Sequence, residues 1–372
     1  MGPLAGVKIV EFAGIGPAPM ASMLLADMGA TVIRIDRVTQ ADLGVPMADE
    51  HEFTKRGRAI IRLDLKQPEA IASVLRLVDT ADGLIEGFRP GVMERLGLGP
   101  DICLARNPKL VFGRVTGWGQ EGPLAQAAGH DLNYIALTGA LHAIGRAGQK
   151  PTPPLNLVGD YGGGALYVAL GLLAGIISAR ATGKGQVVDA AMVDGVLSLM
   201  TPIYAMMAGG RLDGPRGHNQ LDSGAYYYEV YECADGQYVS LAPIEMKFHA
   251  ELLRRLEIDP AGLPEQRDPK GWAELKEKLA AIFRTRSRDE WCRRLEGTDV
   301  CFAPVLSMRE AHLHPHNQAR DAFIDVGHYR QPAPAPRFSA TPNDHPRPPG
   351  TVSAREALTA WGLSSADMAG LL

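Results

Sequence analysis

Two short segments of this chain combine side chains and backbone suited to acid–base chemistry. Residues 129–134 read Gly-His-Asp-Leu-Asn-Tyr and offer the imidazole of His130, and residues 159–164 read Gly-Asp-Tyr-Gly-Gly-Gly and offer the carboxylate of Asp160. Glycines beside both groups let a ligand approach the backbone. An imidazole and a carboxylate on opposite sides of one carbon atom can remove a proton from one face and return one to the other. Two such groups are the fewest that can invert a stereocentre by proton transfer without a metal or redox cofactor.

The elements that must position these groups follow an α/β pattern. Residues 7–12 and 31–36 are predicted to be buried strands with a helix over 18–28 between them, which makes a βαβ unit. Such a unit favours a parallel sheet with right-handed crossovers. Further strands are predicted over residues 59–65, 83–88, 110–116 and 187–192. The fold class expected for this half is α/β.

The pattern changes near Gly209. A strand hairpin over 226–233 and 237–244 is predicted around Ala234-Asp235-Gly236, and helices over 246–256, 272–283 and 288–295 follow it. The Pro-rich residues 331–350 must run extended, and a last helix is expected over 354–361. The predicted organisation is a large α/β domain (1–207), a linker (208–224), a small α+β domain (225–325) and a segment that rejoins the large domain (326–372).

Composition excludes several functional classes. With 372 residues, 46% hydrophobic content and a net charge of −4, the chain is typical of a two-domain globular protein and shows no basic excess for binding nucleic acid. Its 4 cysteines lack a CxxC pair or metal-ligand spacing, so reduced thiols are expected. No signal peptide and no peroxisomal tripeptide are recognisable, and a cytoplasmic location is expected.

One uncharged stretch, residues 161–179, is long enough to raise the question of a membrane span. It begins with three glycines after Tyr161, ends at Arg180 and lacks aromatic anchors at both ends. We expect a helix buried in a core or an interface, and no membrane span.

The turn after the first strand imitates a dinucleotide-binding motif. Gly14 and Gly16 have the spacing of that motif, and Asp36 follows about twenty residues later. Pro19 occupies the position of the third glycine, and Pro17 and Pro19 both lack the N–H groups that would hold a pyrophosphate. An oxidoreductase is therefore not favoured, although the turn lies where a parallel sheet places its ligand crevice.

Several segments along the chain resemble one family in order and spacing. These are residues 3–11, 86–91, 183–189 and 334–339, together with the two segments around His130 and Asp160. The chain resembles the family III CoA-transferase superfamily, and within it the α-methylacyl-CoA racemases. The resemblance spans nearly the whole chain and implies a Rossmann-like large domain, a smaller α+β domain and an interlocked homodimer. It also implies an acyl-CoA substrate in fatty acid or lipid metabolism and no separate cofactor.

The resemblance also implies a site for CoA. Arginine suits it because a guanidinium binds phosphate oxygens in pairs, although a single Arg is more often a solvated surface charge. The residues implied to contact acyl-CoA are Arg37, Leu63, Asp64, Leu65, Lys66, Gly87, Phe88, Arg89, Arg95, Gly129, His130, Asp131, Leu132, Asn133 and Tyr134.

Asp160 has two interpretations. It precedes a predicted helix that begins near Gly162, whose N-terminus favours an ionised carboxylate and offers N–H groups to an enolate oxygen. The glycines at 162–164 are expected to leave room for a thioester. The alternative is that Asp160 only caps the helix, which the residues alone favour.

His130 needs a partner that fixes its tautomer, because a lone loop histidine is usually structural or solvent-facing. By the resemblance, Glu245 is the carboxylate placed against it, and Asn156, Asp131 and Tyr228 support the two acid–base groups. Since Glu245 and Tyr228 lie in the predicted small domain, the site is expected to form between domains.

Three functions remain open at this point. The first is a cofactor-independent racemase that interconverts (2R)- and (2S)-2-methylacyl-CoA through an enolate. The second is a CoA-transferase that uses Asp160 as a nucleophile, although such enzymes resemble this chain less at His130 and Glu245 and carry a Gly-rich loop near 241–245 that it lacks. The third is an acyl-CoA-binding protein without catalysis.

Overall fold

The computed structural model describes residues 2–39 and 47–372, and these form two compact units. The first unit contains residues 1–138, 154–199 and 321–372, and the second contains residues 139–153 and 200–320. Residues 139–153, which the sequence analysis placed in the large domain, group with the second unit. The predicted linker 208–224 also belongs to that unit.

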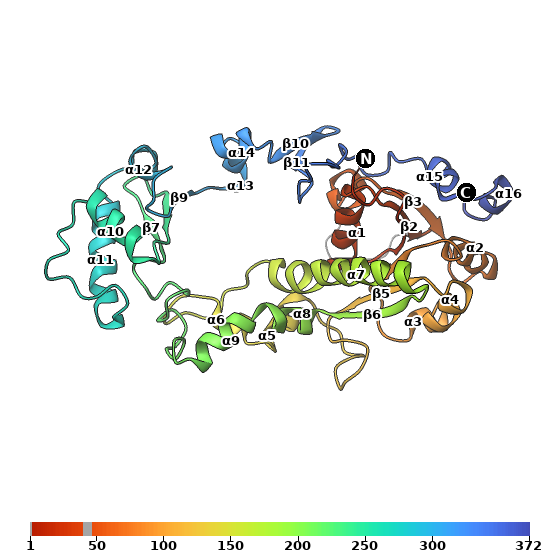
Figure 1. The fold of residues 1–372 in the computed structure, drawn as a ribbon, viewed down its shortest axis with the longest axis horizontal. Helices are drawn as coiled ribbons and strands as arrows, with labels where there is room; N and C mark the ends of the chain where they lie inside the picture. Colours follow the sequence, from red (N-terminus) through yellow and green to blue (C-terminus); the bar gives the residue numbers. More distant parts are fainter. Residues whose placement is uncertain (1, 40–46) are drawn as a thin grey trace. The chain divides into compact units, whose positions relative to one another are not determined.

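The first unit is built on a parallel six-stranded sheet in the order β3-β2-β1-β4-β5-β6 (Figure 1). The predicted parallel α/β sheet is thereby confirmed. Its strands are β1 (Lys8–Phe12), β2 (Thr31–Arg37), β3 (Ala59–Leu63), β4 (Gly83–Glu86), β5 (Val111–Thr116) and β6 (Gln186–Ala191). The order reverses between β1 and β4, because the chain first adds strands on one side of β1 and then on the other.

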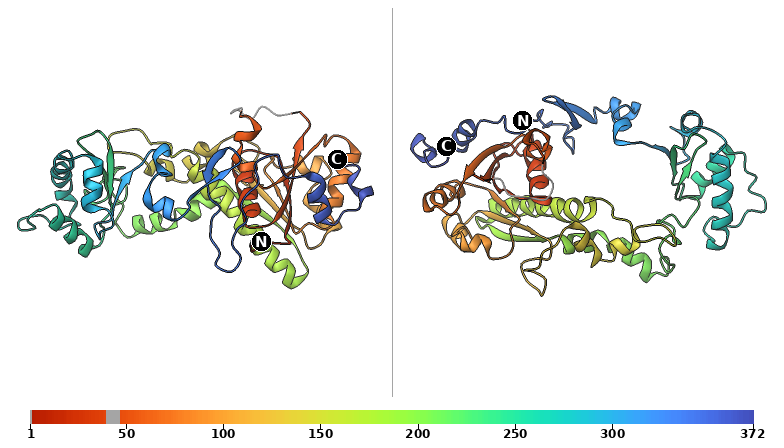
Figure 2. Two further views of the ribbon diagram at one scale, coloured as in Figure 1. Left: turned by 90° about the horizontal axis from the view of Figure 1, so that it is seen from above. Right: turned by 180° about the vertical axis from the view of Figure 1, so that it is seen from behind.

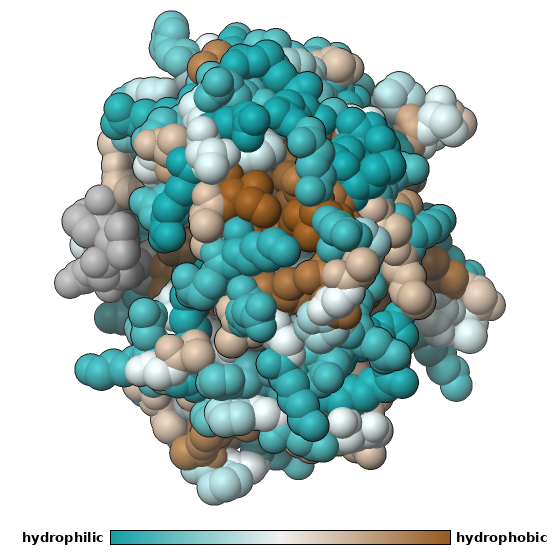
Figure 3. Space-filling model, turned by 90° about the vertical axis from the view of Figure 1, so that its left-hand side faces the viewer, coloured by the Kyte–Doolittle hydropathy of each residue, from teal (hydrophilic) through white to brown (hydrophobic). Residues whose placement is uncertain are grey.

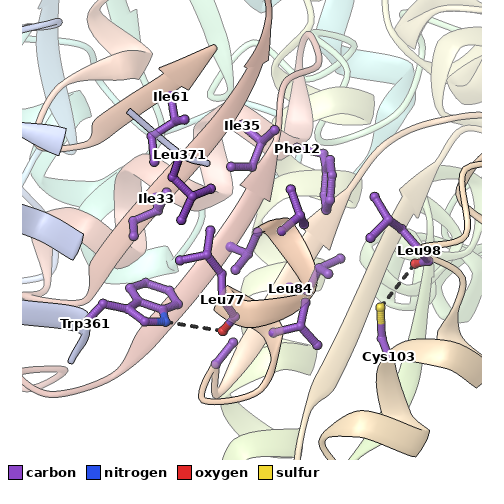
Figure 4. Packing of buried hydrophobic residues seen from close by; sticks show 14 of the residues in the cluster. Phe12, Ile33, Ile35, Ile61, Leu77, Leu84, Leu98, Cys103, Trp361 and Leu371 are labelled. Carbon is purple, nitrogen blue, oxygen red and sulfur yellow. Dashed lines mark hydrogen bonds between the residues drawn. The ribbon is translucent and has the colours of Figure 1, made fainter. Parts of the chain in front are cut away.

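Helices cover both faces of the sheet, and alternate strand residues point to opposite faces. Ile9 and Val32 pack with α1 (Pro17–Asp27) and α7 (Leu166–Thr182) on one face. On the other face, Ile33 packs in a cluster that includes Leu77, Leu84 and Trp361, as Figure 4 shows. The Trp361 indole N–H donates to the carbonyl of Leu77 at 3.2 Å, which joins the C-terminal segment to this core.

Both marked chain ends lie on the first unit (Figure 2). This unit also contains further helices and strands. They are η1 (Asp49–His51), η2 (Phe53–Lys55), α2 (Pro68–Val78), α3 (Val92–Arg95), α4 (Pro100–Arg106), α5 (Asp131–Ala136), the π-helix η3 (Leu157–Ala165), α8 (Met192–Leu199), β10 (Phe323–Val326), β11 (Tyr329–Pro332), α15 (Ala354–Trp361) and α16 (Ser365–Met368).

The second unit packs helices against a three-stranded antiparallel sheet in the order β7-β8-β9. Its elements are α6 (Ala140–Ala143), α9 (Thr201–Ala208), β7 (Glu229–Glu232), β8 (Tyr238–Leu241), α10 (Met246–Arg255), η4 (Pro269–Gly271), α11 (Trp272–Phe283), α12 (Arg288–Leu295), β9 (Phe302–Val305), α13 (Met308–Ala311) and α14 (Pro315–Ala319). The face shown in Figure 3 is mostly hydrophilic, with apolar side chains gathered near its middle.

Among the described residues, Leu157–Thr182 is long and apolar enough to cross a membrane by length and composition. Half of its most apolar window is buried inside the protein. Its buried residues, such as Val168 and Leu172, pack on the sheet beside Ile85 and Val111. Leu166, Leu170 and Ile177 on the same helix are exposed.

Candidate active site

The predicted acid–base residues lie at the carboxyl edge of the sheet, where the strand order reverses. The turns that follow β1, β4 and β5 meet there and enclose a cavity of about 470 Å³. This is the usual place for a ligand crevice in an open parallel sheet. Its lining comprises Ile15, Gly16, Pro17, Gly87, Phe88, Arg89, Pro90, Val115, Thr116, Gly117, Trp118, Ala125, Ala127, Ala128, Gly129, His130, Asn133, Tyr134, Asp160 and Met192. We call it the acid–base cavity.

Asp160 lies within the π-helix η3, and its carboxyl group is held by Asn156 and lies close to Gly16. The Asn156 amide N–H donates to Asp160 Oδ2 at 3.1 Å. A Cβ placed on Gly16 would lie 2.7 Å from the same oxygen, so only glycine lets the carboxylate come this close to the turn after β1. Burial raises the pKa of Asp160, the Asn156 hydrogen bond opposes that rise, and the Asp131 charge adds to it.

Asp131 is buried, does not line the cavity, and supports Asp160 by binding the Asp160 backbone N–H. Its buried carboxylate accepts a 2.7 Å hydrogen bond from the N–H of Asp160. Gly159 makes this contact possible, because a Cβ there would lie 2.4 Å from Asp131 Oδ1. One residue before Asp131, the chain places His130 in extended backbone at the start of α5.

His130 is exposed, and its segment is held from both sides. Its backbone N–H donates to the Asn133 side-chain oxygen at 3.1 Å. The Tyr134 hydroxyl donates to the carbonyl of Gly129, and the Tyr134 ring packs edge-on against Trp118 at 4.8 Å between centroids. The imidazole and the Asp160 carboxylate therefore line one cavity from two segments that the Asp131–Asp160 hydrogen bond joins.

A second cavity of about 370 Å³ shares Ile15, Gly87 and Phe88 with the first. Its lining is strongly charged and consists of Ala13, Gly14, Ile15, Arg34, Asp36, Arg37, Val38, Asp49, Glu52, Lys55, Arg62, Gly87 and Phe88. Arg34, Lys55 and Arg62 are each paired with a carboxylate. Arg37 makes no ion pair within the described part of the chain, so its guanidinium is available to a phosphate.

Comparison with known proteins decides the family. The chain matches the sequence model of CoA-transferase family III over residues 4–353. The chain belongs to CoA-transferase family III. It is 42% identical to the α-methylacyl-CoA racemase of Mus musculus over 340 residues, covering 91% of this chain and 87% of that protein. It is 40% identical to the α-methylacyl-CoA racemase of Homo sapiens over 346 residues, with the same coverage of 91% and 87%.

A solved structure of the family shares the fold. The crystal structure of a CAIB/BAIF family protein from Brucella suis superimposes with a TM-score of 0.83 at 25% sequence identity. The comparison covers 98% of this chain and 100% of that chain. The fold of this family III chain thus agrees with an experimental structure over almost its whole length.

The structure corrects two expectations about the segment after residue 156. Asp160 does not cap the apolar helix: the helical stretch begins at Leu157 with Asn156 as its N-cap, and Asp160 lies in its first turn. The glycines that follow do not clear the cavity either. Gly163 and Gly164 are buried against Met192, where a Cβ on each would lie 2.9 Å or less from a neighbouring atom. They serve helix packing.

The residues implied to bind CoA divide into two groups. Arg37, Gly87, Phe88, Arg89, Gly129, His130, Asn133 and Tyr134 line one or both cavities. Among the residues that the structure describes, Leu63, Asp64, Leu65, Lys66, Arg95, Asp131 and Leu132 line neither. Leu63 and Leu65 pack on the core, and Arg62, the residue before Leu63, lines the charged cavity instead.

Two proposed catalytic residues lie in the second unit. Glu245 is exposed at the N-cap of α10, and Tyr228 packs against that unit's core. Burial raises the pKa of the nearby Cys301 thiol, and the negative charge of Glu245 adds to the rise. No group of three or more His, Cys, Asp or Glu side chains suited to a metal ion occurs in residues 2–39 and 47–372.

Part of the cavity lining was not predicted from the sequence. Thr116 ends β5 and Trp118 follows it, whereas Lys55 precedes β3 and Arg62 is its penultimate residue; none of the four was predicted. For Thr116, Trp118 and Arg62 the available signal was their position, because each lies at or near the carboxyl end of a strand. Lys55 lies before β3 and carries no such signal.

Proposed function

We propose that the chain is a 2-methylacyl-CoA racemase that interconverts (2R) and (2S) thioesters by removing and returning the α-proton. The observation that carries this proposal is the presence of His130 and Asp160 in the lining of one cavity, on two segments held in place by hydrogen bonds. The family and the two racemases that are 42% and 40% identical support the same function.

In this mechanism the deprotonated form of one group, either the Asp160 carboxylate or the neutral His130 imidazole, takes the proton from C2. The electrons of the broken C–H bond pass into the thioester carbonyl, which becomes an enolate. The protonated form of the other group then gives a proton to the opposite face of C2. Asp160 and His130 swap the roles of base and acid when the opposite enantiomer binds. Proton exchange with solvent then restores their starting protonation states.

The charged second cavity is proposed to hold the nucleotide end of CoA. Arg37 would contact a phosphate group of CoA. Gly87, Phe88 and Arg89 would contact the part of the ligand that runs between the two cavities. Glu245 is proposed to orient His130, with Tyr228 in support. The protein is proposed to act in the cytoplasm.

We further propose that the protein is a homodimer whose second units complete the active sites. One observation supports this assembly. Three apolar side chains of α7 are exposed, Leu166 by 54%, Leu170 by 63% and Ile177 by 70%, and their spacing places them on one face of the helix. Exposed apolar surface of this kind marks protein interfaces.

The test is product analysis with a single enantiomer. Purified protein given (2R)-2-methylacyl-CoA and no acceptor acid should form a mixture with the (2S) epimer. If the configuration persists, while an added carboxylate is converted to its CoA thioester, the chain is a CoA-transferase that uses Asp160 as nucleophile.

A further inference from the structure

A chain of three charged side chains, two of them buried, holds the loop that lines the two cavities. Glu86 ends β4 and is fully buried; its Oε1 accepts a 2.8 Å hydrogen bond from Nε of Arg114, and its Oε2 accepts a 2.7 Å bond from the N–H of Phe88. Arg114 on β5 continues to Glu94 on α3, with bonds of 2.8 and 3.3 Å to its two carboxylate oxygens. Glu86, Arg114 and Glu94 are called the clamp below.

The clamp holds both ends of residues 87–91. Glu86 fixes the start of this loop through the Phe88 amide, and Arg114 fixes its far end through Glu94 on the helix that follows. The loop itself faces the ligand space: Gly87 and Phe88 line both cavities, and Arg89 lines the acid–base cavity. None of the three clamp residues lines either cavity described above.

We propose that Glu86, Arg114 and Glu94 are positioning residues that hold loop 87–91 in the conformation that binds the CoA part of the substrate. This inference rests on the proposed function, since it takes CoA as the ligand. The clamp acts through the loop and touches no reacting atom, so its loss should affect binding more than turnover.

Glu86 also makes this device sensitive to pH. Burial raises the pKa of Glu86 to about 7, against the opposing effects of the Phe88 N–H and the Arg114 charge. Glu94, the other carboxylate facing this site, has its pKa lowered by its hydrogen bond to Arg114, and so stays ionised. Above pH 7, both oxygens of ionised Glu86 accept hydrogen bonds. Below it, one oxygen carries a proton and accepts poorly, so the hold on the loop weakens.

The test compares the wild-type protein with Glu86→Gln, using free CoA as the probe and calorimetry between pH 8 and pH 6. Between pH 8 and pH 6, the affinity of the wild-type protein for CoA should fall by about fivefold more than the affinity of the variant does. One net hydrogen bond contributes a factor of about this size. The 3′-phosphate of CoA also takes up a proton near pH 6, but it does so equally in both proteins. Only the difference between them reports on Glu86.

Asp79→Asn is the matched control, because it removes a carboxylate that pairs with Arg106 at the opposite, amino edge of the sheet. It should follow the wild-type pH curve. If Glu86→Gln follows that curve as well, the inference is wrong.

Hydrogen exchange of the Phe88 amide provides a second measurement that needs no CoA. In the intact wild-type protein, protection of this amide should be lower at pH 6 than at pH 8 after correction for the intrinsic rate, whereas Glu86→Gln should show no such change. Equal behaviour would overturn the inference. Failure of both proteins to bind CoA at any pH would instead contradict the proposed function, and the exchange result would still decide the role of the clamp.

Discussion

At the scale of single residues, the environment of the Asp160 carboxyl group is set by one hydrogen-bond donor, Asn156, and by its close approach to Gly16. The carboxyl group is partly buried, which favours its neutral form, and the Asn156 amide is the hydrogen-bond donor that stabilises its charge. A base with a raised pKa binds the abstracted proton more firmly, which suits removal of a weakly acidic α-proton. Asn156 therefore tunes the base as well as orienting it.

Replacing Asn156 by Ala should shift the pH dependence of the reaction. Loss of the donor removes an effect that lowers the pKa of Asp160, so that pKa should rise further. The ionised base is then lost at a higher pH, and the acidic limb of kcat/KM should move upward. Asn317→Ala, which breaks only a bond to the carbonyl of Ala311 in the second unit, is the control. An unmoved limb in Asn156→Ala would contradict the assignment.

The two arginines implied to contact CoA provide a matched pair. Arg37 lines the charged cavity, whereas Arg95 is exposed on α3 and lines neither cavity. Arg37→Ala should raise the KM for a CoA thioester by about tenfold with little change in kcat, because it removes a charge-assisted phosphate contact. Arg95→Ala should have a much smaller effect on KM. Steady-state kinetics with both variants would show the phosphate pocket to be misplaced if Arg95→Ala gave the larger rise.

At the scale of elements, the sequence predicted most of the sheet. Runs of apolar, β-branched residues placed every strand of the six-stranded sheet, and β1 and β2 were predicted to within a residue of their ends. The predicted helices over 272–283, 288–295 and 354–361 coincide with α11, α12 and α15. These elements carry clear periodicity or caps, such as the Ser287–Glu290 capping box.

The π-helix η3 could not be predicted in this way. Its three consecutive glycines look like a helix break, so the helix was expected to start near Gly162 rather than at Leu157. Tertiary contacts override that weak propensity. Asp131 accepts a hydrogen bond from the N–H of Asp160, and Gly163 packs directly against Gly195. A Cβ on Gly195 would lie only 1.9 Å from the carbonyl oxygen of Gly163. A single sequence does not reveal such contacts.

A substitution in this element should therefore be costly. A Cβ on Gly163 would lie 2.6 Å from Val196 Cγ2 and 2.9 Å from the backbone of α8. Gly163→Ala should lower the free energy of unfolding by about 1–3 kcal/mol, measured by denaturant titration, because rigid backbone cannot move aside cheaply. Gly14→Ala, with no atom within 4 Å of its added Cβ, is the control and should change little. Equal stabilities would show that the packing of η3 on α8 is looser than described.

At the scale of the whole molecule, the grouping of segments depends on contacts between distant residues. Residues 139–153 join the second unit through the Arg146–Glu229 ion pair at 2.8 Å and through Arg216, which donates to the carbonyl of His142 at 2.7 Å. Nothing in the local pattern of 139–153 indicates these partners, and the predicted boundary at 207 missed them. The return of the C-terminal helix to the first unit was predicted, since the resemblance implied it.

The proposed shared site can be tested by complementation. Glu245→Gln keeps a hydrogen-bonding group but loses the charge that would stabilise protonated His130, so activity should fall. Co-refolding this variant with His130→Ala should restore part of the activity if each site takes Glu245 from the partner chain. Inactive hybrids, with mass measurements showing that mixed dimers formed, would place both residues of a site in one chain.

The central claim is that His130 and Asp160 move the α-proton of a CoA thioester. The most direct measurement is incorporation of deuterium at C2 of 2-methylacyl-CoA in deuterium oxide, with no metal, nicotinamide or acceptor acid added. The wild-type protein should exchange this proton, and His130→Ala and Asp160→Ala should each slow racemisation by at least about 10²-fold. Absence of exchange in the folded wild-type protein, or exchange that both substitutions leave intact, would contradict the account.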